Sequence, residues 1–276
     1  QPAMAGAGRD FPWILSGDPP RRLASGPKPP LYPRWVTYTG GVHVLHSSPA
    51  LAGNRVYVAV GNPNAGVSGS VLCLDASTGK QVWRAPSPLG DIRGSVSVHG
   101  NAVYAVTGEG WVVAYDAATG RELWHQTLKS ADRQGRPLGI VNAPPVPTRF
   151  GLLVSDWQKP QKLLDYATGK QLVQLAGDVG AYSGFATVFG DVMYSVRRGG
   201  GNALRLPGGE VAWTLAETAR STSAPIVVNG KMIYATSGRI KAVDAATGKP
   251  IWETPHAHAG YQNSIPIAWD DLVLAN

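Results

Sequence analysis

The chain has 276 residues, 43% of them hydrophobic, and a formal net charge of +7. This length and hydrophobic content suffice for a full core, while no apolar run approaches the roughly 20 residues of a transmembrane helix, so none is predicted. Several of the scattered basic residues occupy equivalent turn positions, namely Lys80, Arg121, Lys170 and Lys249. A solvated rim therefore explains the charge better than a nucleic-acid surface, and no nucleic acid is expected as a partner.

The first thirty residues differ in character from the rest of the chain. Gln1–Ala5 resembles the end of an export leader, with Ala3-Met4-Ala5 as a small-x-small cleavage site. Residues 6–30 are proline-rich and are predicted to form a linker. We therefore expect a leader remnant at 1–5, a linker at 6–30 and a folded domain at 31–276. The leader predicts an exported protein, periplasmic or extracellular.

Each unit of the folded domain reads as four short strands. In the first unit these are residues 47–53, 54–61, 68–76 and 81–85, separated by glycine, proline and asparagine. Apolar residues alternate along them, and no stretch carries a helical stripe. The domain is therefore predicted to be almost entirely β.

One sequence motif ends each unit and occurs five times. It consists of an apolar run, a turn centred on Thr-Gly or Gly-Gly, three further residues, and then a Trp or an apolar substitute. The turn glycines are Gly79, Gly120, Gly169, Gly209 and Gly248. Their spacings of 41, 49, 40 and 39 residues match the period of a propeller blade. Because one four-stranded sheet buries too little surface alone, the sequence predicts a β-propeller of four-stranded antiparallel blades around an axis.

The two ends of the folded domain are predicted to share one blade. Leu31–Val36 resembles a fourth strand with no blade before it, and Asn263–Asn276 supplies only two strands. Joining them gives six units, the last composite, with its third strand missing or supplied by Phe11–Gly17. The chain stops inside a repeat, so the possibility that it is a fragment of a parent protein with seven or eight blades stays open.

The repeated turn has a physical reading. In Asp-Ala-Ala-Thr-Gly-Lys the Asp side chain bonds to backbone two residues on, and Gly supplies a positive φ, so the segment forms a tight hairpin. The Trp beyond it is expected to bury its ring between neighbouring blades, worth about 3 kcal/mol. Val173 replaces it in the third unit, which predicts a thinner interface there. The predicted docking residues are Trp35, Trp83, Trp124, Trp213 and Trp252.

The motif is nearly complete at Leu74–Trp83, Tyr115–Trp124 and Val243–Trp252. It resembles the tryptophan-docking repeat of the pyrroloquinoline quinone (PQQ) propeller superfamily, and the resemblance covers about residues 33–276. That superfamily includes PQQ-dependent alcohol dehydrogenases, a non-enzymatic lipoprotein of outer-membrane protein assembly, and propellers attached to secreted metallophosphoesterases. Its dehydrogenases carry adjacent cysteines, a catalytic Asp and calcium. Here Cys73 stands alone, so PQQ and redox catalysis are not expected.

Aligning the blades places one polar residue at the start of each innermost strand. Because these strands line the central channel, the side chains are predicted to form a ring at its funnel-like mouth, where a small ligand could bind. The alternative is that residues beside a water-filled funnel are polar without binding anything. The six residues are His46, Arg93, Asn142, Ser183, Thr222 and Asn263.

Four of the six histidines fall in two loops, His43 with His46 and His256 with His258. If six blades close the ring, these loops adjoin on one face and their imidazoles could hold a divalent metal. Chance placement is the alternative, because neither loop contains a carboxylate.

We therefore expect an exported, non-catalytic PQQ-like propeller that serves as a binding or scaffold module. No residue is predicted to be catalytic and no cofactor is expected, although the histidine loops allow a divalent metal. A protein or envelope component is the expected partner, and a small-molecule ligand is allowed. The alternatives are a fragment of a PQQ-dependent alcohol dehydrogenase and the accessory propeller of a secreted metallophosphoesterase.

Overall fold

The computed structural model describes residues 22–23, 32–40, 48–61, 69–87, 89–92, 94–128, 143–156, 159–176, 186–197, 199–217, 224–255, 267–269 and 272–274. These residues form five four-stranded antiparallel sheets and one three-stranded sheet. Among them no helix is long and apolar enough to cross a membrane. The prediction of an all-β propeller is confirmed.

The five complete blades each use four consecutive strands. Blade 1 contains β2 (Ala50–Ala52), β3 (Arg55–Val60), β4 (Ser70–Asp75) and β5 (Gln81–Pro86). Blade 2 contains β6 (Ser97–His99), β7 (Ala102–Val106), β8 (Trp111–Asp116) and β9 (Glu122–Thr127). Blade 3 contains β10 (Val146–Thr148), β11 (Gly151–Asp156), β12 (Lys159–Leu164) and β13 (Gln171–Gln174). Blade 4 contains β14 (Ala186–Phe189), β15 (Val192–Arg197), β16 (Gly200–Arg205) and β17 (Glu210–Leu215). Blade 5 contains β18 (Ile226–Val228), β19 (Lys231–Thr236), β20 (Arg239–Asp244) and β21 (Pro250–Pro255).

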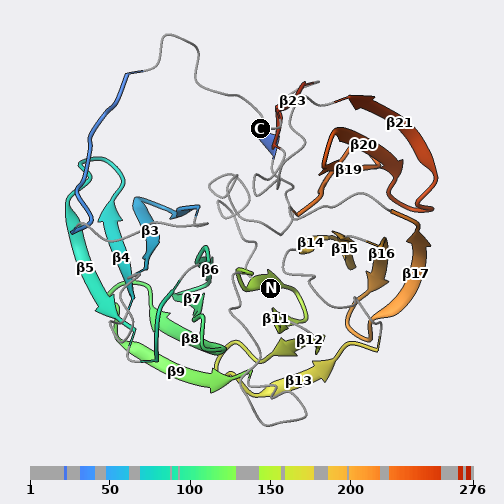
Figure 1. The fold of residues 1–276 in the computed structure, drawn as a ribbon. Helices are drawn as coiled ribbons and strands as arrows, with labels where there is room; N and C mark the ends of the chain where they lie inside the picture. The colour runs from blue at the N-terminus through green and yellow to red at the C-terminus, as the bar shows by residue number, and fades with distance from the viewer. Residues whose placement is uncertain are drawn as a thin grey trace.

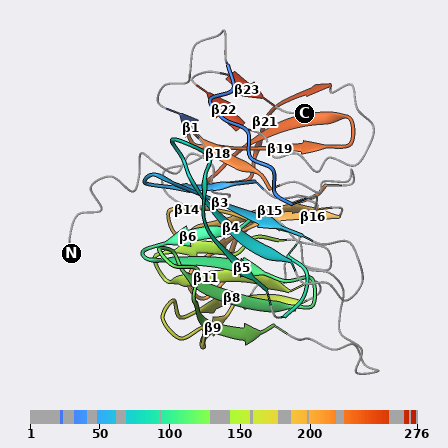
Figure 2. The ribbon, with the colours of Figure 1, turned by 90° about the vertical axis from the view of Figure 1, so that its left-hand side faces the viewer.

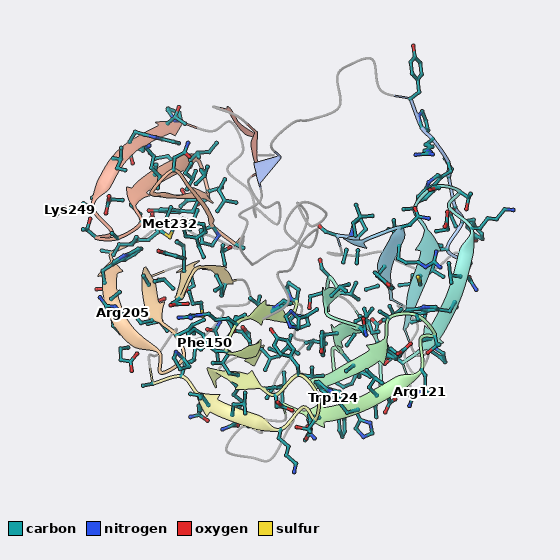
Figure 3. All side chains as sticks on the ribbon, turned by 180° about the vertical axis from the view of Figure 1, so that it is seen from behind. Arg121, Trp124, Phe150, Arg205, Met232 and Lys249 are labelled. Atoms are coloured by element: carbon teal, nitrogen blue, oxygen red, sulfur yellow. The ribbon has the colours of Figure 1, made fainter. Side chains whose placement is uncertain are left out.

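The blades follow one another around an arc in chain order (Figure 1). The first strand of each blade contacts the first strand of the next, so these strands surround the axis and the fourth strands form the outer rim. Seen from the side, the sheets stack against one another (Figure 2). The predicted solvated rim agrees with the exposure of Lys80, Arg121, Lys170 and Lys249, and Figure 3 shows Arg121 and Lys249 along the outer circumference.

Both ends of the chain contribute to the sixth sheet. β1 (Arg22–Leu23) pairs in parallel with β22 (Ile267–Trp269), which pairs antiparallel with β23 (Leu272–Leu274). A short strand therefore lies within the segment expected to be a linker. Phe11–Gly17, the other suggested source of a strand, lies outside the described residues.

The N-terminal segment Tyr32–Gly40 is not a strand, so the fourth-strand prediction for Leu31–Val36 is wrong for its described part. A fourth strand needs a third strand to pair with, and this segment instead lies along blade 1. Arg84 Nη2 donates to Thr39 O at 2.7 Å, and Thr37 Oγ1 donates to Gly79 O at 2.6 Å.

The apolar cores lie between blades rather than within them. Tyr57, Cys73 and Trp83 of blade 1 pack in one buried cluster with Val103 and Val113 of blade 2. Alternation along the strands explains this arrangement, because each strand presents one set of side chains to the preceding blade and the other set to the following blade. Each interface is therefore a two-sheet core.

The Asp-x-x-Thr-Gly hairpins form as the sequence predicts. Asp75 Oδ1 accepts hydrogen bonds from the backbone N–H groups of Ser77 (3.0 Å) and Thr78 (2.9 Å), and Gly79 has a φ of +70°. The Thr78 hydroxyl also donates to Asp75, and this bond is the main reason that the pKa of Asp75 lies below its usual value. Asp116, Asp165 and Asp244 repeat the pattern with their own threonines.

A β-bulge precedes the docking position in every complete blade. The register between the third and fourth strands shifts by one residue there, so that Cys73 faces Trp83 while Leu74 faces Gln81. The other blades shift at the same place. A bulge bends the strand and re-aims the next side chain, and in each blade the next side chain is the one at the docking position.

Four tryptophans lie on the hairpin of the following blade. Each indole N–H donates to the carbonyl of the residue after the hairpin Asp, at 2.9 to 3.0 Å. The four bonds run from Trp35 to Ala76, Trp83 to Ala117, Trp124 to Tyr166 and Trp213 to Ala245. Figure 3 marks Trp124 in blade 2.

Two interfaces depart from this contact. Val173 is only partly buried, and at that interface Ala176 N donates to Gly208 O of the next hairpin at 2.9 Å. The chain therefore replaces an indole contact with a backbone hydrogen bond. Trp252 occupies the docking position of blade 5 but is 38% exposed, whereas Trp83 and Trp213 are each 8% exposed.

Candidate functional site

The two faces of the ring carry different connections. The turns between first and second strands and the turns between third and fourth strands lie on one face, which we call the hairpin face. The connections from second to third strands, and from each outer strand to the next blade, leave on the other face, which we call the loop face. Loops held by rigid sheets are where propellers place their variable recognition groups.

The residues predicted to bind a ligand or metal all stand, by chain position, in segments that precede the first strand of a complete blade or β22 of the sixth sheet. All of them lie outside the described residues: His43, His46, Arg93, Asn142, Ser183, Thr222, His256, His258 and Asn263. Both the funnel ring and the histidine metal site therefore stay predictions.

Asp91 and Ile92, the described residues just before Arg93, belong to a closely packed rim between blades 1 and 2. Ile92 is 1% exposed and bridges to Thr107, and Gly108 N donates to Asp91 O at 2.7 Å. Glu109 Oε2 accepts from the backbone N–H of Asp91 at 3.1 Å. The chain just before this predicted ligand-binding position is thus held by hydrogen bonds to blade 2.

Close packing also explains a glycine at this rim. Gly90 has a φ of +111°, and a Cβ built on it would lie 1.8 Å from Glu109 Oε2. Any larger residue would push the Glu109 carboxylate away from Asp91. The rim therefore depends on the missing side chain at this position.

A buried charged network crosses the interface between blades 4 and 5. Glu217, 3% exposed, accepts hydrogen bonds at Oε2 from Lys241 Nζ (2.9 Å) and from the Tyr234 hydroxyl (3.2 Å). Lys241 Nζ also lies 4.0 Å from Glu253 Oε2, and Arg239 Nη1 donates to Glu253 Oε1 at 2.7 Å. The network leads from the blade interface to the outer rim.

Burial and the Glu217 charge both act on the tyrosine of this network. Burial comes first in raising the pKa of Tyr234, and the neighbouring carboxylate raises it further. The phenol therefore stays protonated and donates to Glu217. Sequence analysis missed this network, although one signal was present: Glu217 stands four residues after Trp213, where Ser87 and Leu128 stand after Trp83 and Trp124.

Polar side chains also occupy the interface between blades 3 and 4. Gln161 Nε2 donates to Ser155 Oγ at 2.9 Å on blade 3, and Ser195 Oγ donates to Asn202 Oδ1 at 2.7 Å on blade 4. All four side chains are buried. Blade 2 has Val106 and Val112 at the positions of Ser155 and Gln161. The interface between blades 3 and 4 therefore has hydrogen-bonded groups where the interface between blades 2 and 3 has apolar side chains.

The described residues show no chemistry typical of a redox or nucleophilic centre. Burial raises the pKa of the Cys73 thiol to about 11, which leaves it protonated near neutral pH. Cys73 is flanked by Leu72 and Leu74, so it cannot form the vicinal disulfide that the PQQ dehydrogenases use. Within the described part of the chain no three His, Cys, Asp or Glu residues gather closely enough to hold a metal ion.

Solved structures share the blade arrangement. The assembly factor BamB from Moraxella catarrhalis aligns with a TM-score of 0.55 at 20% identity, over 72% of this chain and 57% of that one. Quinohemoprotein alcohol dehydrogenase from Comamonas testosteroni aligns with a TM-score of 0.61 at 16% identity, over 78% of this chain and 43% of that one. At these identities the likeness concerns the fold alone.

Sequence comparison is more specific. A family described as outer membrane protein assembly factor BamB matches residues 26–139 and 162–276. A protein of that name from Burkholderia pseudomallei is 31% identical over 265 residues, which cover 87% of this chain but only 62% of the relative. With its repeated tryptophan-docking hairpins, the chain belongs to the BamB family within the PQQ-like repeat propellers.

Proposed function

We propose that this chain is a non-catalytic binding scaffold that engages protein partners in outer-membrane protein assembly. The family match over both halves of the chain carries this proposal, since the Burkholderia relative bears the name of an assembly factor. A protein with that role works in the periplasm, in line with the resemblance of Gln1–Ala5 to the end of an export leader. We place the chain there as part of the proposal.

The mechanism proposed is recognition by rigidly held loops. The sheets and the inter-blade cores fix the strand ends, so loops on one face keep their relative positions when a partner binds. We therefore place the binding surface on the loop face and assign the hairpin face to stabilising the ring.

The cysteine content of the chain does not favour redox catalysis with PQQ. Cys73 is single and buried, and its raised pKa makes it a poor thiolate. The resemblance to the Comamonas dehydrogenase, at 16% identity, concerns only the propeller architecture. We accordingly propose that the chain needs no quinone cofactor.

Binding to the outer-membrane assembly machinery, purified from cells that lack their own assembly factor, tests the proposal. We expect saturable binding that weakens when Arg93→Ala and Asn263→Ala, at two of the predicted ligand-binding positions, are combined. Lys249→Ala, exposed on the hairpin face, is the matched control and should bind as the unmodified chain does. No binding, or equal loss in the control, would contradict the scaffold role, and saturable PQQ binding with calcium would restore the dehydrogenase alternative.

A further inference from the structure

The turn between β18 and β19 differs from the equivalent turns of the other blades. Asn229 and Gly230 form this turn between Val228 and Lys231, which pair with each other. Both turn residues have a positive φ, +48° at Asn229 and +71° at Gly230, as a type I′ hairpin turn requires. Among the described residues, Asn229 is the single non-glycine residue with such a φ. In blades 1 and 2 the order is reversed, with glycine before asparagine.

An asparagine that is followed by glycine can react with its own backbone. The backbone nitrogen of the following residue can attack the side-chain amide carbon, which closes a cyclic imide. A side chain on the following residue hinders this approach, whereas glycine leaves the nitrogen open. Asn229 and Gly230 are both exposed, so water and hydroxide reach the reacting atoms.

The other asparagines are less suited to this reaction. Asn229-Gly230 is the one Asn-Gly step in the sequence, and every other asparagine is followed by a residue with a side chain or is the last residue. Asn101 stands at the equivalent turn of blade 2 and is also exposed, but Ala102 follows it. The reaction should therefore concentrate at Asn229.

The turn also supports the interface between blades 4 and 5. Gly230 O accepts a hydrogen bond from Ala245 N at 2.8 Å, and Ala245 O accepts the indole N–H of Trp213 at 2.9 Å. Ala245 and Trp213 are 7% and 8% exposed. A change in the backbone of the turn therefore reaches a buried contact through these hydrogen bonds.

We propose that Asn229 is a site of spontaneous deamidation that loosens the contact between blades 4 and 5. Gly230 N loses its proton to hydroxide and bonds to Asn229 Cγ, the Cγ–Nδ2 bond breaks, and the amide nitrogen takes a proton from water and leaves as ammonia. Water then opens the cyclic imide at either carbonyl, which gives aspartate or isoaspartate. Isoaspartate adds a methylene group to the backbone of the turn and displaces Gly230 O from Ala245 N. Water is the co-reactant, nothing is oxidised, and the inference does not depend on the proposed scaffold function.

The test incubates the whole folded chain in mildly alkaline buffer made with heavy-oxygen water and follows its peptides by mass spectrometry. We expect heavy oxygen to enter the peptide that contains Asn229 about ten-fold faster than the peptide that contains Asn101, because only Asn229 precedes a glycine. Asn229→Gly is the matched control, since it removes the amide and keeps a residue that accepts a positive φ. This variant should take up no heavy oxygen at the turn.

Equal rates at Asn229 and Asn101 would overturn the proposal. Conversion of Asn229 in urea but not in the folded chain would also overturn it, because the left-handed turn would then protect the side chain. Thermal melts test the link to the blade interface. The incubated protein should melt at a lower temperature than fresh protein, whereas Asn229→Gly should melt alike before and after incubation. An unchanged melt of the converted protein would contradict the loosening of the contact.

Discussion

Truncating two tryptophans at the same repeat position should have very different effects on stability. Trp83 is 8% exposed, donates to Ala117 O at 3.0 Å and packs against Tyr57 with ring centroids 5.8 Å apart. Truncating a buried Trp to Ala costs about 3–5 kcal/mol through lost burial and the cavity left behind. The carbonyl left without its donor adds to this cost, so Trp83→Ala should destabilise the protein by about 4 kcal/mol or more.

Trp252→Ala is the internal comparison. Its ring is 38% exposed, and no described residue accepts a hydrogen bond from its indole. With part of the ring already in water and no hairpin of the described residues against it, we expect a loss of roughly 1 kcal/mol. The two variants remove the same atoms from the same strand position, so their difference isolates the contribution of the docked hairpin.

Urea unfolding followed by far-UV circular dichroism measures both variants, with the slope compared to check that the transition keeps its cooperativity. The expected result is a large shift of the midpoint for Trp83→Ala and a small one for Trp252→Ala. Equal losses would refute the reasoning, because they would mean that burial at the hairpin does not decide the contribution of a docking tryptophan.

Three further results follow from the structure. Gly120→Ala should destabilise by about 3 kcal/mol more than Gly100→Ala, because both have positive φ but only Gly120 lies against an indole; equal midpoints in urea would contradict the close contact. Glu217→Gln should lower the free energy of unfolding by about 3 kcal/mol, because it leaves the Lys241 ammonium poorly paired. Adding Lys241→Met to this variant should restore part of the lost stability in thermal melts, and no restoration would argue against the pair. The pKa of Asp244 is lowered in the fold, so its contribution is complete above about pH 4, its unfolded value, and is lost as pH falls through the folded pKa; Asp244→Ala should therefore show a shallower loss of stability below pH 4, and a parallel acid profile would contradict this.

The repeat period predicted the fold because it reports a physical unit. Each interval near 40 residues contains enough strand for one sheet and ends in a hairpin whose Asp and Gly satisfy local backbone rules. Both constraints are local in sequence, so the hairpin at Asp75–Gly79 could be predicted without knowing its neighbours. The bulge before the docking position lay beyond this reasoning, because register depends on the pairing of two strands.

The interfaces between blades were harder to predict. The motifs that end at Trp83 and Trp252 are nearly the same in sequence, yet Trp83 is buried and Trp252 is partly exposed. Burial of the ring depends on which hairpin lies opposite, and the motif itself does not specify that hairpin. Glu217 likewise acquires its role from Lys241, 24 residues away on the next blade. The predicted funnel and histidine residues lie in connections outside the described part of the chain, so they stay open to experiment.

Two kinds of contact hold neighbouring blades together, and they do different work. The Trp–hairpin contact uses the same carbonyl and the same glycine at every interface where it occurs, so it supplies stability without distinguishing one blade from another. The polar groups differ between interfaces: a charged pair joins blades 4 and 5, whereas the buried amide and hydroxyl groups at the interface of blades 3 and 4 form hydrogen bonds within their own blades. Because an unpaired buried charge is costly, a blade placed beside the wrong neighbour would lose more than it gains from docking its tryptophan. The repeated contact therefore stabilises the ring, and the charged pair favours blade 5 as the neighbour of blade 4.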